Sequence, residues 1–215
     1  YKAAPEIVMK AQSMRARLTG YSYGGCLVST WRIINIIRAL KPDVVHLHSI
    51  NSYMVNLYRI LDFLKSMRIP TVITLHAEFF YTGGCSYSKE CNQWLTGCCR
   101  EGNDCPEFNR LCPPSWFFNR AESAWDKLCN SYRNFDKLAL CAVSGWVHDR
   151  AIQSPFFRDK RVRTVLNGLD TSVFAPRGRE ELARQLDIAD KKIVLHVTPS
   201  FLNPIKGGKH VIEAA

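Results

Sequence analysis

The sequence contains no long apolar run and no recognisable signal peptide. A transmembrane helix needs about 18 or more consecutive apolar residues, and the 215 residues hold no such run. The chain begins at Tyr1 rather than at methionine, so the missing signal says nothing about any segment upstream. Internal repeats and low-complexity tracts are also absent. With 47% apolar and 22% charged residues, the composition excludes a disordered or fibrous protein and is typical of a globular one.

Acidic residues are comparatively few. The chain has 19 of them against 29 lysines and arginines, which gives a formal net charge of +10. A basic balance favours anionic partners such as nucleic acid, lipid headgroups or phosphorylated small molecules, and solubility alone is the competing explanation. The charges are spread along the chain, and no spacing typical of an RRM, KH or zinc-finger module is present. Nucleic acid is therefore not an expected partner.

Cysteine is the residue that the sequence has in unusual number and arrangement. The nine cysteines cannot all pair with one another, because their number is odd. Cys26, Cys129 and Cys141 lie in apolar stretches and are expected to be buried reduced thiols. The other six fall in an insertion at 83–112, namely Cys85, Cys91, Cys98, Cys99, Cys105 and Cys112. The rest of the composition is that of a cytosolic enzyme, which disfavours a secreted disulfide scaffold.

The insertion at 83–112 leaves three interpretations open: a structural zinc, disulfides, or free thiols. A zinc ion could give this long loop a centre to fold around, and the ligands would be Cys85, Cys91, Cys98 and Cys105, with Cys99 as a substitute for Cys98. A site of four thiolates would be structural rather than catalytic. The closely spaced C-x-x-C pair that makes a zinc signature specific is absent, so the spacing does not decide between the three.

Alternating short β-branched runs and amphipathic stretches predict an α/β fold. Expected strands lie at 43–49, 71–77, 138–144 and 162–170, and expected helices at 27–42, 52–67, 116–135 and 145–154. The order predicts a doubly wound, Rossmann-like parallel sheet with flanking helices and right-handed crossovers. It occupies residues 1–175 and includes the insertion.

The amino-acid composition changes after this first domain. Residues 176–190 are polar, carry Pro176 and Gly178, and are expected to form a linker that contains a short helix. A new strand at 192–198 and a helix after it predict that 191–215 begins a second Rossmann-like domain. About 30 residues cannot bury a core of their own, so we expect the sequence to be a piece of a longer protein.

Polar side chains close several of the predicted strands. His48 and Ser49 end the first, His76 the second and Ser144 the third, while the Asn167-Gly168 turn signal follows the fourth. In open α/β sheets, ligands bind beyond the carboxyl ends of the strands. A histidine there can contact a sugar hydroxyl or a phosphate and can carry a proton near neutral pH. A satisfied structural hydrogen bond is the competing explanation. It is favoured for His46, whose side chain we expect to point into the layer between sheet and helices.

A second candidate site lies near the end of the chain. Lys206, Gly207 and Gly208 stand at the expected start of a helix, one loop after a strand. Backbone amides at a helix N-terminus and a lysine together favour a phosphate group. The G-x-x-x-x-G-K-[ST] pattern of a P-loop is absent, and an ordinary turn is the competing explanation.

Taken together, the segments "KPDVVHLHS", "IPTVITLH", "CAVSGWVHDR", "VRTVLNGLDTSVFAP", "KKIVLHVTPSF" and "KGGKHVIEAA" resemble the family 4 glycosyltransferases, which have the GT-B fold. The tract "YTGGCSYSKECNQWLTGC" is similar to a bacterial subgroup that builds capsular, exopolysaccharide or colanic-acid-type chains. The resemblance implies retaining transfer of a sugar from a nucleotide diphosphate sugar to a glycan or polyprenyl-diphosphate-linked acceptor, with no catalytic metal. The acceptor would bind the first domain and the donor the second.

Carried over by position, the resemblance implies that His76 contacts the transferred sugar and is the catalytic residue. Asn167, Gly168, Lys206 and Gly207 would bind the donor, with Ser200 as a partial match to the subgroup. His48, Ser49 and Ser144 would lie on the acceptor side. The family's Gly-Arg segment before the lysine is missing, and its Glu-x(7)-Glu element would lie beyond residue 215. We therefore expect the 215 residues alone to be inactive.

The resemblance also implies a cytoplasmic enzyme that is peripheral to the inner face of a bacterial membrane. Its basic residues would then meet an anionic surface. Candidates are the stretch 158–163 and Arg120, with ordinary solvated surface as the competing explanation for each. Two alternative functions remain: a nucleic-acid-binding module built on a zinc loop, and another GT-B-like enzyme such as a sugar epimerase.

Overall fold

The computed structural model describes residues 5–50, 53–100, 105–108, 115–176, 178 and 180–214. The insertion 83–112, which includes Cys112, and the linker 176–190 are therefore described only in part. The chain divides into two compact units, Tyr1–Asn167 and Gly168–Ala215, and each is considered by itself. Within the described residues, no helix combines the length and the apolar character needed to cross a bilayer.

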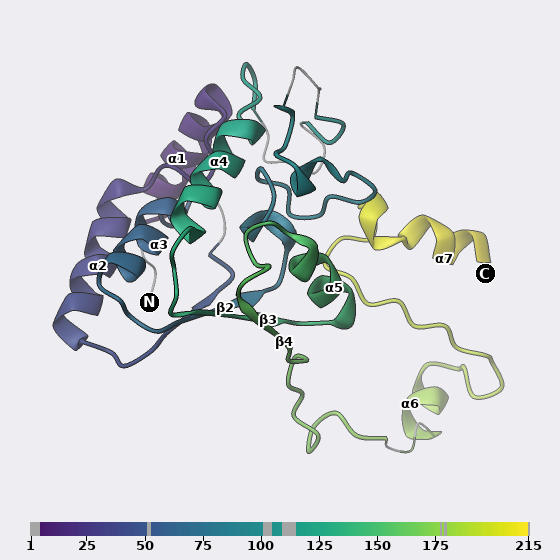
Figure 1. Ribbon diagram of the computed structural model, residues 1–215. Helices are drawn as coiled ribbons and strands as arrows, with labels where there is room; N and C mark the ends of the chain where they lie inside the picture. Colours follow the sequence, from purple (N-terminus) through teal and green to yellow (C-terminus); the bar gives the residue numbers. More distant parts are fainter. Residues whose placement is uncertain are drawn as a thin grey trace. The chain divides into compact units, whose positions relative to one another are not determined.

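The first unit is built on a four-stranded sheet in which all neighbours are parallel. The strands are β1 (Val45–His48), β2 (Thr71–Leu75), β3 (Leu138–Ala142) and β4 (Arg161–Thr164), and their order in the sheet is β1-β2-β3-β4. This confirms the predicted α/β fold with a parallel sheet (Figure 1). The fourth strand begins and ends earlier than the predicted 162–170, because after Thr164 only Val165 continues the ladder, by donating to the carbonyl of Ala142.

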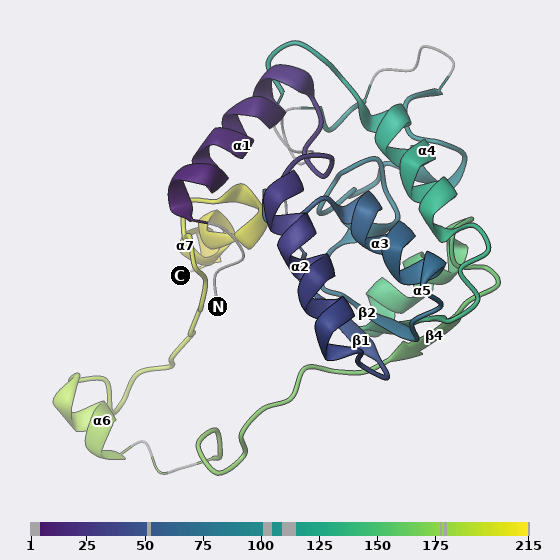
Figure 2. The same ribbon diagram turned by 90° about the vertical axis from the view of Figure 1, so that its left-hand side faces the viewer.

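Helices pack on one face of this sheet, so the predicted doubly wound arrangement, with helices on both faces, is not found among the described residues. These helices are α2 (Leu27–Leu40), α3 (Leu57–Ser66), α4 (Ala121–Tyr132) and α5 (Gly145–Gln153). Sequential parallel strands joined by right-handed crossovers put every connecting helix on the same side, and both views show this arrangement (Figures 1 and 2). In α3, Leu57, Ile60, Leu61 and Leu64 are at most 1% exposed. Their spacing of three and four residues gives the helix an apolar stripe that faces the sheet.

The alternation of side chains along each strand separates the two faces of the sheet. Leu47 of β1, Ile73 of β2 and Leu140 of β3 point toward the helices and are buried in the core. The alternate residues, which include His46 and Thr74, therefore lie on the opposite face.

A further helix, α1 (Glu6–Thr19), precedes these elements and was not predicted. It ends at Gly20, which has a φ of 76°, a conformation that glycine adopts without strain. A Cβ atom at Gly20 would come within 2.5 Å of the carbonyl oxygen of Phe118. The glycine therefore allows the end of α1 to approach the segment before α4 closely.

The described part of the cysteine-rich insertion packs against the hydrophobic core. It contains the short 3₁₀ turn η2 (Gln93–Leu95) and follows a similar turn, η1 (Glu78–Phe80). Phe80, Tyr81 and Trp94 are each at most 1% exposed. Trp94 within the insertion and the two rings just before it therefore connect its described part to the hydrophobic core.

The second unit contains α6 (Glu180–Gln185), the 3₁₀ turn η4 (Pro204–Lys206) and α7 (Gly208–Ala214). The short helix expected in 176–190 and the helix after Lys206 are therefore both present. The strand predicted at 192–198 is not formed. Val194, Leu195 and Val197 are more than 80% exposed in an extended segment. A strand needs a neighbour for its backbone hydrogen bonds, and none pairs with it among the residues described here.

Candidate active site

Three of the predicted site residues lie at the same edge of the sheet. His48 is the last residue of β1, His76 directly follows β2, and Ser144 comes shortly after β3. His48 is in register with Thr74, and Leu75 with Ala142. Since the strands are parallel, their carboxyl ends meet at one edge, which is where ligands bind in sheets of this type.

The histidines at this edge are joined in a chain of hydrogen bonds. His48 Nδ1 is 3.3 Å from His76 Nε2, and His48 Nε2 is 3.3 Å from His46 Nδ1. The chain continues from His46 Nε2 to the hydroxyl oxygen of Thr74 at 2.8 Å. The histidine side chains are exposed, on the face of the sheet that α3, α4 and α5 do not cover. The prediction that His46 points into the layer under the helices was wrong, because His46 and His48 are two residues apart on one strand and share a face.

In this series of hydrogen bonds, the position of the proton on one side chain determines the proton positions on the others. A neutral imidazole has one nitrogen that donates and one that accepts. If Thr74 donates to His46, each histidine donates to the next, and His76 keeps an N–H at Nδ1. If the direction is reversed, His76 donates to His48 and its Nδ1 becomes an acceptor. The arrangement therefore offers His76 as either a donor or an acceptor toward a ligand.

Thr74 is the member of this chain that sequence analysis missed. It is 6% exposed in the middle of β2 and looks like an ordinary strand residue. The alternation of side chains along a strand could have identified Thr74, because Thr74 and His76 share one face of the second strand as His46 and His48 share one face of the first.

Partial desolvation of the exposed ring lowers the pKa of His46, and the neighbouring His48 lowers it further. His46 is thus expected to titrate below the ordinary value of about 6.5, and His48→Gln should move its pKa back upward. Because the unfolded chain binds this proton more readily, His46 removes stability as the pH falls below its ordinary pKa and has no effect well above it. A ¹H NMR titration of the imidazole signals measures both shifts. A pKa of His46 at or above its ordinary value would contradict the partial desolvation of its ring beside His48.

Ser144 has a structural task at the same edge. It is the N-cap of α5, and its hydroxyl oxygen accepts a hydrogen bond from the backbone N–H of Val147 at 3.2 Å. Serine is favoured at this position for that reason. Its O–H remains a donor toward a ligand. Ser49 is exposed, with a left-handed φ of 42° where the chain turns away from β1.

The turn predicted at Asn167 and Gly168 is not formed, because residues 165–170 are exposed and have no regular secondary structure. A turn follows instead at Asp170, whose carbonyl accepts from Phe174 N–H at 2.8 Å. The side chain and backbone of Ser172 donate to the Asp170 carboxylate and lower its pKa. A Cβ at Gly168 would meet no atom within 4 Å. The carboxylate of Asp170, rather than the Asn-Gly pair, therefore nucleates the turn.

The residues predicted to bind the donor belong to the second unit, apart from Asn167. Lys206 ends η4, Gly207 has a φ of 70°, and α7 begins at Gly208. A Cβ at Gly208 would come within 2.2 Å of the Phe201 carbonyl oxygen, so this glycine permits a close approach of two backbone segments. Ser200 N–H donates to the hydroxyl of Thr198 at 3.3 Å. The lysine side chain is exposed beside this tight turn.

Several of the described cysteines of the insertion are engaged in other contacts. Cys85 is part of a disulfide, so it is not a thiolate ligand. Cys98 accepts a hydrogen bond from the backbone N–H of Gly83, and burial raises the pKa of its thiol to about 12. Cys99 and Cys105 are hydrogen-bonded to each other, which lowers the pKa of Cys99 and raises that of Cys105.

Within the described part of the chain, no group of three or more cysteine, histidine or acidic side chains is arranged to hold a metal ion. Zinc binding by the insertion stays a prediction, and it would require reduction of the disulfide at Cys85. Cys26 is buried as predicted, whereas Cys129 and Cys141 are only partly buried. All three are free thiols.

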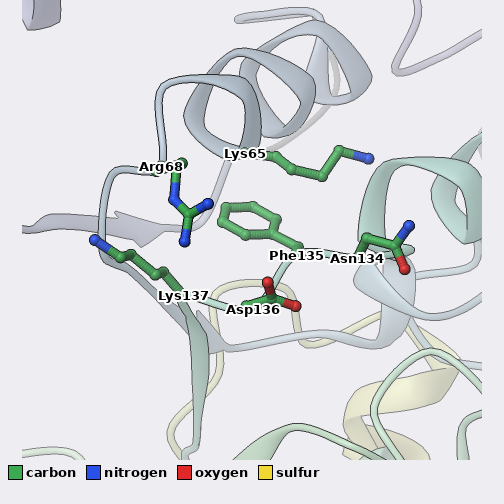
Figure 3. A pocket seen from close by; sticks show the side chains of 6 residues that line it. All are labelled: Lys65, Arg68, Asn134, Phe135, Asp136 and Lys137. Atoms are coloured by element: carbon green, nitrogen blue, oxygen red, sulfur yellow. The ribbon is translucent and has the colours of Figure 1, made fainter.

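A pocket of the first unit lies at the opposite edge of the sheet. It is lined by Lys65, Arg68, Asn134, Phe135, Asp136 and Lys137 (Figure 3). Arg68 comes just before β2 and Lys137 just before β3, so the pocket is at the amino ends of the strands. Lys65 donates to the carbonyls of Asn130 and Arg133 at the end of α4. This lysine serves the fold, and the candidate site remains the histidine edge.

Comparison with known proteins identifies the family of the chain. The sequence profile of glycosyltransferase family 4 matches residues 13–173. The chain is also 26% identical over 179 residues to WcaC of Escherichia coli (strain K12), whose name provisionally assigns it as a glycosyl transferase of colanic acid biosynthesis. That alignment covers 81% of this chain and 42% of WcaC, so the chain spans less than half of its relative. No solved structure gives a significant match. Since the family profile covers most of the chain, including all four strands, the chain belongs to glycosyltransferase family 4.

Proposed function

We propose that the protein transfers a sugar, with retention of anomeric configuration, from a nucleotide diphosphate sugar to a glycan or lipid-linked acceptor in the synthesis of a bacterial polysaccharide. The observation that carries the proposal is the exposed chain of His46, His48 and His76 at the carboxyl edge of a family 4 sheet. Hydrogen-bond donors and acceptors in that place suit a polyhydroxylated ligand. The similarity to WcaC supports a polysaccharide as product.

The chemistry assigns different tasks to the two groups of residues. His76 would contact a hydroxyl of the sugar being transferred, which orients the ring for attack at its anomeric carbon. His48, Ser49 and Ser144 would receive the acceptor. The leaving group is a nucleoside diphosphate, and its growing negative charge would be stabilised by Lys206 and the backbone amides near Gly207. Asn167, Gly168 and Ser200 would complete the donor site.

The test is an assay of the full-length protein against a panel of nucleotide diphosphate sugars with lipid-diphosphate-linked glycans as acceptors. We expect release of nucleoside diphosphate that depends on both substrates, and a product with the anomeric configuration of the donor. The 215 residues alone should be inactive. Release of free sugar epimers without transfer to an acceptor would instead support an epimerase, and turnover by the isolated 215 residues would contradict the predicted need for further residues.

A surface near the start of α4 suits the proposed peripheral association with an anionic membrane. Trp116, Phe117 and Phe118 are consecutive and 47–67% exposed. They adjoin the end of α1, since Trp116 N–H donates to the carbonyl of Arg17 at 2.7 Å. The guanidinium of Arg120 lies over the Phe118 ring at 5.0 Å. Exposed aromatic rings beside arginines are typical of surfaces that meet the headgroup region of anionic bilayers.

We therefore expect the protein to bind vesicles of phosphatidylcholine mixed with phosphatidylglycerol, and high salt to weaken the binding. Replacing Trp116 and Phe117 with serine should reduce the partition coefficient by more than about tenfold, because each buried aromatic ring contributes about 1.5–3 kcal/mol. Met67→Ser, which removes an exposed apolar side chain at the end of α3, should change little. Equal binding by all three proteins in a flotation assay would rule this surface out.

A further inference from the structure

A buried ion pair lies next to the candidate site and has no part in the function proposed so far. Glu78 begins η1, two residues after His76, and its side chain is 1% exposed. Arg150 of α5 donates from Nε to Glu78 Oε1 at 2.5 Å, and its side chain is 16% exposed. Buried charges are costly unless they are paired and fully hydrogen-bonded. Burying this pair therefore costs folding free energy, and its hydrogen-bond partners indicate its role.

The partners of the pair come from the cysteine-rich segment, which we define as residues 83–99. Ser88 donates to Glu78 Oε2 with both its backbone N–H and its hydroxyl. The same hydroxyl oxygen accepts from Arg150 Nη2 at 2.6 Å. The hydroxyl of Tyr81 donates to Glu78 Oε1 at 3.1 Å. Four donors thus converge on one carboxylate, and two of them belong to a single residue of the cysteine-rich segment.

Aromatic rings from two elements enclose the guanidinium of Arg150. It lies 4.9 Å from the ring centre of Trp94 in the cysteine-rich segment and 5.1 Å from that of Trp146 in α5. Such cation–π contacts strengthen when they are shielded from water. Trp94 is itself fixed, because its indole N–H donates to the Cys91 carbonyl and its own carbonyl accepts from the indole of Trp125. Arg150 therefore joins the segment to α5, the helix that Ser144 caps.

We propose that Glu78 and Arg150 are positioning residues that hold the cysteine-rich segment against α5, and that this placement sets acceptor selection at the histidine edge. The inference rests on the proposed function. The pair connects three parts of the chain that border the candidate site: the stretch directly after His76, the cysteine-rich segment, and the helix that begins after Ser144. Neither side chain contacts the reacting atoms in this proposal. They act by keeping the segment in one position.

The first experiment measures the segment itself by hydrogen exchange and mass spectrometry of the full-length protein. In Glu78→Gln and Arg150→Met, amide exchange of residues 83–99 should accelerate by about tenfold or more, which corresponds to a locally destabilised unit. Exchange in α3 should not change. Arg184→Met is the control, because Arg184 forms an exposed ion pair with Glu181 within α6. It should leave exchange of the segment unchanged.

The second experiment separates acceptor binding from donor binding in the transfer assay. We expect both variants to raise KM for the acceptor by about tenfold while KM for the donor changes less than about twofold. Arg150→Lys should give an intermediate value, because lysine keeps the charge but cannot reach Glu78 and Ser88 with a planar fork. A purely structural role would instead lower the amount of active enzyme and leave both KM values unchanged.

The outcomes distinguish this inference from the proposed function. If the wild-type protein shows no transfer, the function fails while hydrogen exchange still tests the placement of the segment. If transfer occurs and the variants keep the wild-type acceptor KM or the wild-type protection of residues 83–99, the inference is overturned. If a variant also loses protection in α3, its whole fold is lost, and Arg150→Lys then decides by the same two measurements.

Discussion

Full-length enzyme that carries His76→Ala is expected to lose about 10²- to 10⁴-fold in kcat/KM, the range typical when a positioned acid–base or polar group is removed from a reacting centre. The reason lies in the hydrogen-bond chain. His48 occupies Nε2 of His76 at 3.3 Å, so the other nitrogen of His76 remains available to a substrate. Alanine removes that contact and also leaves His48 without its partner.

The matched control is His48→Gln, which keeps a hydrogen-bonding side chain beside His76. If His76 contacts the transferred sugar and His48 contacts the acceptor, this variant should lose less kcat/KM than His76→Ala, chiefly through a higher KM for the acceptor, while the pH dependence of kcat/KM shifts. Steady-state kinetics over a range of pH values measures both effects. A His76→Ala enzyme with nearly wild-type kcat/KM would remove His76 from the mechanism, and a larger loss in His48→Gln than in His76→Ala would move the role to His48.

The sheet could be predicted from the sequence because short β-branched or apolar runs alternate with amphipathic stretches. β2 is a run rich in β-branched residues and β3 is a continuous apolar run, and both lie between helices. Helix α1 was not predicted, because its sequence carries many charged and polar residues and its only buried residue is Ala16. A helix with so narrow an apolar stripe leaves almost no periodic signal. The strand predicted at 192–198 is not formed, because the local β-propensity of a segment cannot supply the neighbouring strand that it needs.

The candidate site was predictable only where the rule of parallel strands applies. His48, His76 and Ser144 each follow or end a strand, so their convergence at one edge required nothing beyond strand order. The contact between Glu78 and Arg150 joins residues 72 positions apart, and no pattern along the chain relates them. The same holds for the disulfide at Cys85, because cysteine spacing does not fix connectivity. Side-chain partners across long separations are set by packing, which single-sequence patterns do not encode.

Replacing Trp94 with alanine is expected to lower the free energy of unfolding by about 3–5 kcal/mol, the usual range for removing a large buried aromatic side chain. Trp94 is 1% exposed although it lies in the cysteine-rich segment. Its ring is 5.3 Å from that of Tyr81 and 4.9 Å from the guanidinium of Arg150. Alanine would leave a cavity and would also uncover one side of a buried charge. Urea unfolding followed by far-UV circular dichroism measures the change.

Trp116→Ala provides the control, because it is the same substitution about twenty residues further along the sequence. Trp116 is 53% exposed, so its loss should change the free energy of unfolding by no more than about 0.5 kcal/mol. A large difference between the two variants would mean that the segment around Trp94 unfolds together with the sheet. If both variants unfold like the wild type, residues 83–99 are not part of the core. In that case Glu78 and Arg150 would have no fixed segment to position, and the proposed control of acceptor selection would fail with them.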